Sequence, residues 1–237
     1  MKFTVYAFAC LASVAILSSC NRPCIEGSGN QITQDRTVEP FTGIETGGSV
    51  KLILKQDSIQ KVSITADDNV QEYIKTRVKG DRLVIEPENN VCNGGPVTVY
   101  VNAKNFTGVS ASGAVEIVGE DRINTGDFTL DLSGDSKVNL NINAGKVKTS
   151  SKGTSDIMLQ GQARRHEIEL SGAGELNAFD FVVADYKIES SGSTNCKINV
   201  LNSLDVRSSG SSTIEYRGNP KQVNNDQSGA ASIKKVN

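Results

Sequence analysis

The side chains best suited to catalysis or metal binding are few in this chain: a single histidine, His166, and five cysteines. A structural zinc site needs four Cys or His ligands at close spacing, and these residues are scattered. We find no G-x-S-x-G nucleophile elbow and no phosphate-binding P-loop. The segment Ser58-Ile59-Gln60-Lys61 has S-x-x-K spacing, but it lacks partner motifs and is interpreted as a chance match. We therefore expect no catalytic residue, no metal site and no cofactor.

Cys20 is the cysteine whose surroundings indicate a modification. Lys2 precedes an apolar run from Phe3 to Leu17, which is typical of a secretory signal peptide and short for a membrane span. The run ends in Leu17-Ser18-Ser19-Cys20, which resembles a bacterial lipobox, in which the cysteine is lipidated and becomes the first mature residue. Acyl chains anchor stably because each buried CH₂ contributes roughly 0.8 kcal/mol. The alternative is ordinary cleavage near Ser19, which leaves a free thiol.

The remaining cysteines suggest one disulfide. Cys10 leaves with the signal peptide. In an oxidising envelope, Cys24 and Cys92 can pair and tie the start of the fold to the loop at 89–96. Two unpaired thiols are the alternative, because spacing alone does not establish disulfide geometry. Cys196 falls at an inward position of the repeat described below and is expected to be a small buried hydrophobe.

Two further polar features are candidate sites. Asp57-Ser58-Ile59 resembles a short bacterial O-glycosylation signal of Asp, then Ser or Thr, then an aliphatic residue, which makes Ser58 a candidate acceptor. The alternative is an ordinary Asx turn. The acidic residues Asp131, Asp135 and Asp156 do not form a calcium-binding loop and are expected at solvated corners.

Composition favours a β-rich exported domain. The chain has 25 basic and 27 acidic residues, a formal net charge of −2, and removal of Lys2 with the signal peptide makes the mature part slightly more acidic. This balance, without a basic cluster, argues against nucleic acid as a partner. There are 22 glycines, no tryptophan, and short alternating runs of Val, Ile and Thr, which indicate many short strands. The best helical candidate is short, at 69–78.

A repeat is the most informative pattern in the sequence. Seven glycines recur at nearly regular intervals, and Ser precedes six of them. Apolar residues recur four residues after the glycine, and again six and four before it, so each unit is interpreted as strand, Ser-Gly turn, strand. The glycines are Gly113, Gly134, Gly153, Gly172, Gly192, Gly210 and Gly229.

Units of about 19 residues cannot bury an apolar face alone, but stacking them makes a continuous core. We therefore predict an all-β, right-handed parallel β-helix-like solenoid over 106–237, with serines hydrogen-bonded up the corner. A meander of antiparallel hairpins is the alternative. We expect a less regular β region over 31–105, a tether over 20–30 and a signal peptide over 1–19, with both β regions sharing one sheet system.

Several segments outside the repeat form a recognisable set together with it. They are Gly27-Ser28-Gly29-Asn30, Val38-Glu39-Pro40-Phe41-Thr42-Gly43-Ile44, Gly48-Ser49-Val50-Lys51-Leu52, Asp68-Asn69-Val70 with Tyr73-Ile74, Arg82-Leu83-Val84-Ile85 and the Ser-Gly repeats. With these segments the chain resembles the auto-transporter adhesin, head GIN domain family of Bacteroidetes lipoproteins, over nearly all of the mature chain. The resemblance implies a β-helix-like fold and a surface or periplasmic adhesion role, and it brings no catalytic residues.

Three functions remain open from the sequence. The first is a non-enzymatic, lipid-anchored adhesin of the outer membrane that binds a glycan, matrix or protein through its repetitive surface, where repetition suits avidity. The second is a periplasmic structural or partner-binding protein. The third is a glycan-active enzyme, which needs clustered carboxylates in a groove; the outward repeat positions show no such cluster. The segment 179–185 is either a partner patch or a third strand of its unit.

Overall fold

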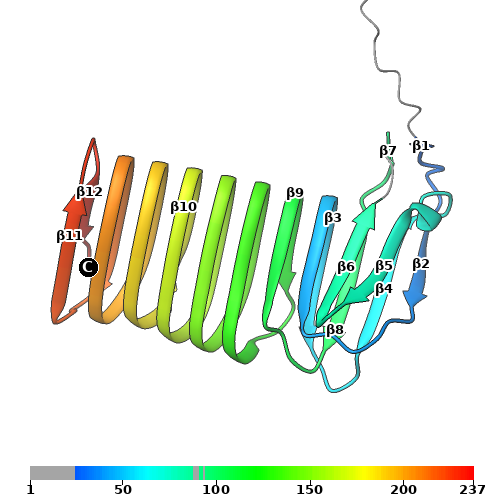
Figure 1. Cartoon of the computed structure of the whole chain (residues 1–237), viewed down its shortest axis with the longest axis horizontal. Helices are drawn as coiled ribbons and strands as arrows, with labels where there is room; N and C mark the ends of the chain where they lie inside the picture. The colour runs from blue at the N-terminus through cyan, green and yellow to red at the C-terminus, as the bar shows by residue number, and fades with distance from the viewer. Residues whose placement is uncertain (1–24, 88–90, 93) are drawn as a thin grey trace, which may run out of the picture.

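The computed structural model describes residues 25–87, 91–92 and 94–237, which form strands and one short 3₁₀ helix (Figure 1). The all-β, largely parallel architecture that the sequence predicts is confirmed. The elements are β1 Ile25–Glu26, β2 Gln31–Arg36, β3 Gly43–Gln56, β4 Lys61–Asp67, η1 Gln71–Tyr73, β5 Ile74–Lys79, β6 Arg82–Pro87, β7 Val91–Cys92, β8 Thr98–Ala103, β9 Gly108–Gly119, β10 Ile123–Gly218, β11 Gln222–Gln227 and β12 Ser232–Lys235.

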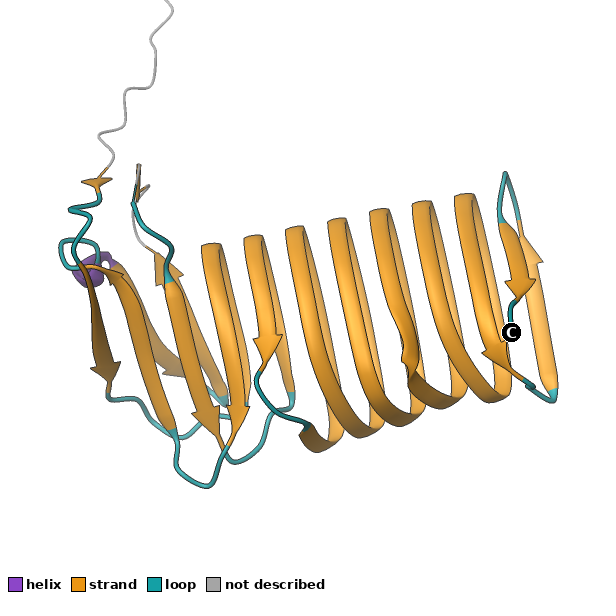
Figure 2. Ribbon diagram, turned by 180° about the vertical axis from the view of Figure 1, so that it is seen from behind, coloured by secondary structure: helices purple, strands orange, loops and turns teal. Residues whose placement is uncertain are grey.

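The C-terminal part of the chain forms a coil. β10 is one extended stretch of 96 residues that winds through successive turns, here called rungs, as Figure 2 shows. β9 pairs in parallel with the first part of β10. β11 and β12 pair in parallel with its last part, where Leu204 lies beside Val223 and Ile214 beside Ile233. Parallel rungs lie about 4.8 Å apart, so each strand hydrogen-bonds to its equivalent in the next rung.

The repeating glycines lie on top of one another and make the corner of every rung. A Cβ added to Gly134 would lie 2.6 Å from the carbonyl oxygen of Gly113, and the φ of Gly134 is +98°. The chain bends here without a separate turn, because strand pairing with the adjacent rungs continues through the glycine. This glycine corner also includes Gly48 of β3 and comprises Gly48, Gly113, Gly134, Gly153, Gly172, Gly192, Gly210 and Gly229.

The core fills the inside of the coil with alternate residues of each rung. We number positions from the corner glycine: −6, −4 and −2 point inward before it, and +2, +4 and +6 after it. Next to the corner, two rungs have a large residue at −2 and a small one at +2, namely Leu132 with Ser136 and Leu170 with Gly174. Other rungs have small hydroxyl side chains at both positions, as at Ser190 and Thr194, so the space beneath the corner is filled differently from rung to rung.

The N-terminal region, here called the cap, consists of β1, β2, β4 to β8 and η1. β3 belongs to the coil, since it pairs with β9 on one side and with β6 and β8 on the other, all in parallel. Antiparallel strands then close this end: β4 pairs with β8, β2 with β4, and β5 with β6. One ten-stranded sheet therefore runs through both regions.

Two local expectations differ from the structure in detail. The helical candidate at 69–78 is helical only over η1 and continues as strand β5, because Ile74 and Val78 turn inward as alternate residues against β6. In the segment 179–185, Phe181 and Val183 are buried, so it is mainly a strand of its rung rather than an exposed patch. Within the described residues, no helix is long and apolar enough to cross a membrane.

Candidate functional site

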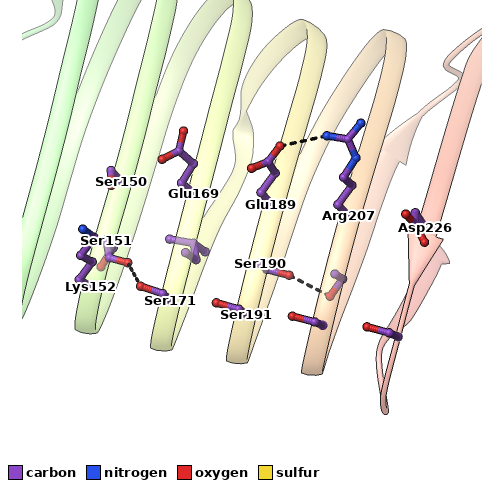
Figure 3. Close-up of a pocket in the computed structure, with 14 residues that line it drawn as sticks. Ser150, Ser151, Lys152, Glu169, Ser171, Glu189, Ser190, Ser191, Arg207 and Asp226 are labelled. Atoms are coloured by element: carbon purple, nitrogen blue, oxygen red, sulfur yellow. Dashed lines mark hydrogen bonds and ion pairs between the residues drawn. The ribbon is translucent and has the colours of Figure 1, made fainter.

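A groove runs along the coil on one side of the glycine corner. Its lining repeats in successive rungs, from positions −3, −2 and −1, and it crosses five of them with a volume of about 560 Å³. Figure 3 shows its labelled side chains in rows, each row collecting equivalent positions of successive rungs. We call this surface the serine groove. Its lining is Ser150, Ser151, Lys152, Glu169, Leu170, Ser171, Glu189, Ser190, Ser191, Arg207, Ser208, Ser209, Asp226 and Ser228.

The groove continues toward the cap. A second hollow, lined at the same positions of earlier rungs, shares Ser150 and Lys152 with the first. It begins at Glu45 of β3 and passes Ser112 and Ser133. The two hollows together follow the corner along nearly the whole coil, so any occupant that uses them fully must be extended and must cross the strands.

Serine hydroxyls at position −1 form one edge of the groove. Ser133 and Ser171 donate weakly to carbonyl oxygens of the preceding rung, Ala111 and Ser151, at 3.4 Å each. Among the described residues, the hydroxyls of Ser191 and Ser209 have no hydrogen-bond partner. Within the described ranges, the corner serines therefore bond up the stack only at Ser133 and Ser171, and there to backbone carbonyls rather than to one another.

A different set of hydroxyls does form a network, beneath the corner at positions −2 and +2. Ser190 contacts Ser208 at 2.9 Å and donates to Ser212 at 3.2 Å. Thr194 donates to Ser212 at 3.0 Å. All four side chains are buried, because the bend at the glycine turns the residues two before and two after it toward each other. This network satisfies polar groups inside the wall of the groove and stiffens it.

Charged side chains form the other edge, at position −3, and are mostly paired. Glu169 lies 3.1 Å from Lys148, and Glu189 lies 2.7 Å from Lys187 and 3.3 Å from Arg207. The hydrogen bond from Lys187 lowers the pKa of the Glu189 carboxyl, so that group stays ionised in mildly acidic solution. The groove is thus polar and close to electrically neutral rather than strongly acidic.

His166 and Cys196 lie inside the coil and away from the groove. The imidazole contacts Thr149 Oγ1 at 2.9 Å and packs edge-on against Phe181, with 5.5 Å between ring centroids. Its Nδ1 has no partner within the described structure, and burial lowers the pKa of His166 to about 3. Burial raises the pKa of the Cys196 thiol to about 12. Both residues are neutral core residues at physiological pH.

The N-terminal family motif has a structural role in the cap. Ser28 donates to Asp68 at 2.5 Å, and Asn30 donates to the same carboxylate at 3.0 Å. These two bonds, that of Ser28 first, lower the pKa of Asp68. Asn69 accepts from the Ser28 amide and donates to the Glu26 carbonyl. The motif therefore clips the entering chain onto the β4–η1 connection.

The other sequence-predicted site residues do not join the groove. Ser58 is exposed in the turn between β3 and β4, where Asp57 Oδ1 accepts from the Ile59 amide at 3.2 Å. The neighbouring Ile59 is 72% exposed. Cys20 and Cys24 lie outside the described residues. β1 begins at the residue after Cys24 and pairs with β7, which ends at Cys92, and the disulfide stays a prediction.

Sequence reasoning missed the groove, although its signal was present. Aligning the repeat on its glycines aligns position −3 as well, and that position is acidic in five rungs. These carboxylates are far apart along the chain, and they form a row only when equivalent positions of successive rungs are compared. They are Glu45, Asp131, Glu169, Glu189 and Asp226. No group of His, Cys, Asp or Glu in the described ranges is arranged to hold a metal ion.

Comparison with known structures shows the same fold. A putative adhesin from Bacteroides fragilis matches with a TM-score of 0.85 and 22% identity, covering 90% of this chain and 100% of the other. A putative lipid binding protein from Parabacteroides distasonis matches with a TM-score of 0.68 and 21% identity, covering 91% and 100%. A putative adhesin from Parabacteroides merdae matches with a TM-score of 0.61 and 21% identity, covering 90% and 99%.

The family comparison covers most of the chain. No curated protein is significantly similar to it. The family model described as putative auto-transporter adhesin, head GIN domain, matches residues 40–220, which include β3, the cap strands β4 to β8, and the coil through β10. The chain belongs to this family.

Proposed function

We propose that the protein is a non-enzymatic adhesin, lipidated at Cys20, that displays its coil at the outer face of the cell envelope and binds partners through the serine groove. The single observation that carries this proposal is the groove itself, whose lining comes from equivalent positions of five consecutive rungs, with Ser at position −1 in four of them. Repetition along a rigid axis gives many weak, equivalent contacts, and these suit avid attachment to a repetitive partner. We also propose that the coil winds in a right-handed sense.

The geometry of the cap supports this orientation. Ile25, the first described residue, lies in β1 at the cap end, and β11 and β12 lie at the opposite end (Figure 1). The short segment from Cys20 to Ile25, even if fully extended, spans at most about 18 Å. A lipid on Cys20 therefore keeps the cap near the membrane, and the groove then extends away from it along the coil.

The charges in the groove argue against glycoside hydrolysis. That chemistry needs one carboxyl kept protonated near neutral pH by a raised pKa. The pKa of Glu189 is shifted in the opposite direction, and Glu169 is held by Lys148 at 3.1 Å. A periplasmic structural role is the second candidate, because the fold contains a rigid coil that serves equally as a spacer.

The proposal is tested by adhesion of cells that carry the full-length gene. Cells with the wild-type protein should adhere to immobilised extracellular matrix and polysaccharides more than a deletion strain. The Cys20→Ala variant, which lacks the lipid site, should adhere as poorly as the deletion strain while the protein appears in the soluble fraction. Equal adhesion of the wild-type and deletion strains would overturn the adhesin proposal and favour the structural role.

Ser58 and the cysteine pair stay proposals with their own tests. We propose that the exposed turn at Ser58 accepts an O-linked glycan, which should appear as added mass on the intact protein that is absent from Ser58→Ala. An unmodified mass of the wild-type protein would contradict this proposal.

We propose a disulfide between Cys24 and Cys92, which should appear as a linked peptide pair in a non-reduced digest. Free thiols at both cysteines would contradict it.

A further inference from the structure

The serine groove has chemistry that selects among ligand classes. We propose that it binds a neutral, linear polysaccharide lying along the coil axis, with one sugar unit near each rung. This inference rests on the proposed binding function and names the ligand class for the same site. Its evidence is the direction of the groove, the side chains along it and its balance of charge.

The direction of the groove demands an extended ligand. The groove crosses five rungs, and four steps of about 4.8 Å make it roughly 19 Å long. A ligand placed there meets equivalent positions again after each step: a hydroxyl at −1 in four of the five rungs, with Lys152 in the fifth, and a charged or polar group at −3. A polymer of similar units can repeat its contacts at this pitch, whereas a compact ligand uses only one or two rungs.

The lining favours hydroxyl-bearing partners over proteins. Protein interfaces usually depend on aromatic or Arg anchors seated in pockets. In the described lining, Leu170 is the single large apolar residue, no aromatic residue is present, and Arg207 is paired with Glu189 at 3.3 Å. Backbone pairing with a peptide strand is also blocked, because the rungs already pair with one another on both sides. Serine hydroxyls and carboxylates are, in contrast, matched donors and acceptors for the hydroxyls of sugars.

Charge excludes the strongly charged polymers. The lining carries Lys152 and Arg207 against Glu169, Glu189 and Asp226. Lys148 and Lys187, just outside the groove, pair with two of those carboxylates. An anionic polymer such as a nucleic acid needs a large excess of cations, and on this surface the four cations are nearly balanced by three carboxylates. The ion-paired carboxylates remain hydrogen-bond acceptors, so a neutral chain suits them best.

The test is a titration of the full-length lipoprotein, in detergent micelles, with size-fractionated neutral oligosaccharides: β-glucan, mannan and galactan series. Hyaluronan and polyglutamate serve as anionic probes. At least one neutral series should bind, and its affinity should rise with chain length until the chain spans five rungs and then level off. No binding to any neutral series, or tighter binding of the anionic probes, would overturn the inference.

Matched variants locate the binding. The triple variant Ser171→Gln, Ser191→Gln and Ser209→Gln fills the groove from position −1 and should weaken binding at least about tenfold, since each lost hydrogen bond costs several-fold in affinity. The control variant Ala173→Gln, Ser193→Gln and Ser211→Gln changes position +1, across the same three glycines, and should bind like the wild type. Equal affinity of all three proteins, or equal loss in both variants, would contradict the groove as the site.

Failure of the polysaccharide assignment is separable from failure of the adhesin proposal. If cells adhere and the groove-filled variant adheres equally well, the ligand assignment is wrong and adhesion uses another surface. If the purified protein binds a neutral polysaccharide through the groove but cells do not adhere, the ligand class holds and the adhesin proposal fails. Circular dichroism of both triple variants confirms that they are folded before binding is compared.

Discussion

The coil and the cap of this protein bury apolar residues by different means. In the coil, every rung repeats the same inward positions and the same glycine corner, so each contact occurs several times with different side chains. In the cap, antiparallel strands meet only once, and single polar side chains hold them together. Gln71 is the clearest example, since it bonds to β2 and β4 at once. Repetition gives tolerance to side-chain change, whereas the cap depends on individual residues.

The corner glycine is the one position of the rung where the coil should not tolerate substitution. We expect the largest loss of unfolding free energy there. Gly134→Ala places a Cβ 2.6 Å from the Gly113 carbonyl oxygen at a φ of +98°. We expect a loss of about 4 kcal/mol in unfolding free energy, from backbone strain and the forced separation of two rungs. Denaturant unfolding followed by circular dichroism measures it.

Two glycines outside the corner serve as controls for that change. Gly126 lies in the coil with open space around its Cβ direction, and Gly126→Ala should change stability little. Gly80, in the turn between β5 and β6, has a φ of +65° and no neighbour within 4 Å, so Gly80→Ala should cost about 1 kcal/mol. Similar losses at Gly134 and Gly126 would refute the stacked corner.

Gln71 should show the dependence of the cap on single residues. Its Nε2 donates to the Ile32 and Ile64 carbonyls at 2.9 and 2.8 Å, and its Oε1 accepts from Arg36 at 2.8 Å. We expect Gln71→Ala to cost about 3 kcal/mol, because buried carbonyls lose their donor. Ser212→Ala, which removes two hydroxyl contacts in the coil, should cost about 1 kcal/mol. A larger cost at Ser212 in thermal unfolding would reverse the comparison.

His166 makes the stability of the coil depend on pH. The folded pKa of about 3 lies below the ordinary value of 6.5, so the unfolded chain binds the proton first as pH falls. Stability from this residue is therefore complete above pH 6.5 and declines toward pH 3. Between about pH 7.5 and pH 5 we expect a loss of about 2 kcal/mol.

A double variant isolates this pH effect. His166→Leu with Thr149→Val removes the titrating ring and the hydroxyl that contacts it. Its unfolding free energy should be nearly constant from about pH 7.5 to about pH 5, a range above the ordinary pKa of carboxyl groups. If the double variant keeps the same slope as the wild type in urea titrations, another group is responsible.

Removing a surface ion pair should give the smallest loss of stability, and the loss should be the same in the coil and in the cap. Glu175 lies 3.3 Å from Lys197 in the coil, and Glu86 lies 2.8 Å from Arg77 in the cap. All four side chains are at least 30% exposed. We expect Glu175→Gln and Glu86→Gln each to cost less than about 0.5 kcal/mol in thermal unfolding. A cost at either site as large as that expected for Gln71→Ala would show that surface charge contributes to the difference between the regions.

The same contrast explains what the sequence could predict. Spacing of Gly and Ser between units predicted the stacked corner residues, and the phase of the repeat placed His166 and Cys196 inside. The cap has no repeat, so the partners of Gln71 and the pairing of Ser28 with Asp68 could not be inferred. The sequence predicted hydrogen bonds among the serines at position −1, whereas the hydroxyl network lies at positions −2 and +2, as at Ser190 and Ser212. Nothing in the sequence shows how sharply the chain bends at each glycine, and this bend decides which hydroxyls meet.

The central claim is that the groove-bearing coil is displayed outside the cell. Ser211→Cys places one exposed thiol on the coil, and the wild type, with Cys24, Cys92 and the buried Cys196, measures the background labelling. Intact cells carrying this full-length variant are treated with a membrane-impermeant maleimide and compared with lysed cells. The account predicts labelling of Ser211→Cys on intact cells at the level seen after lysis. Labelling that appears only after lysis would contradict surface display and leave the protein as a periplasmic component.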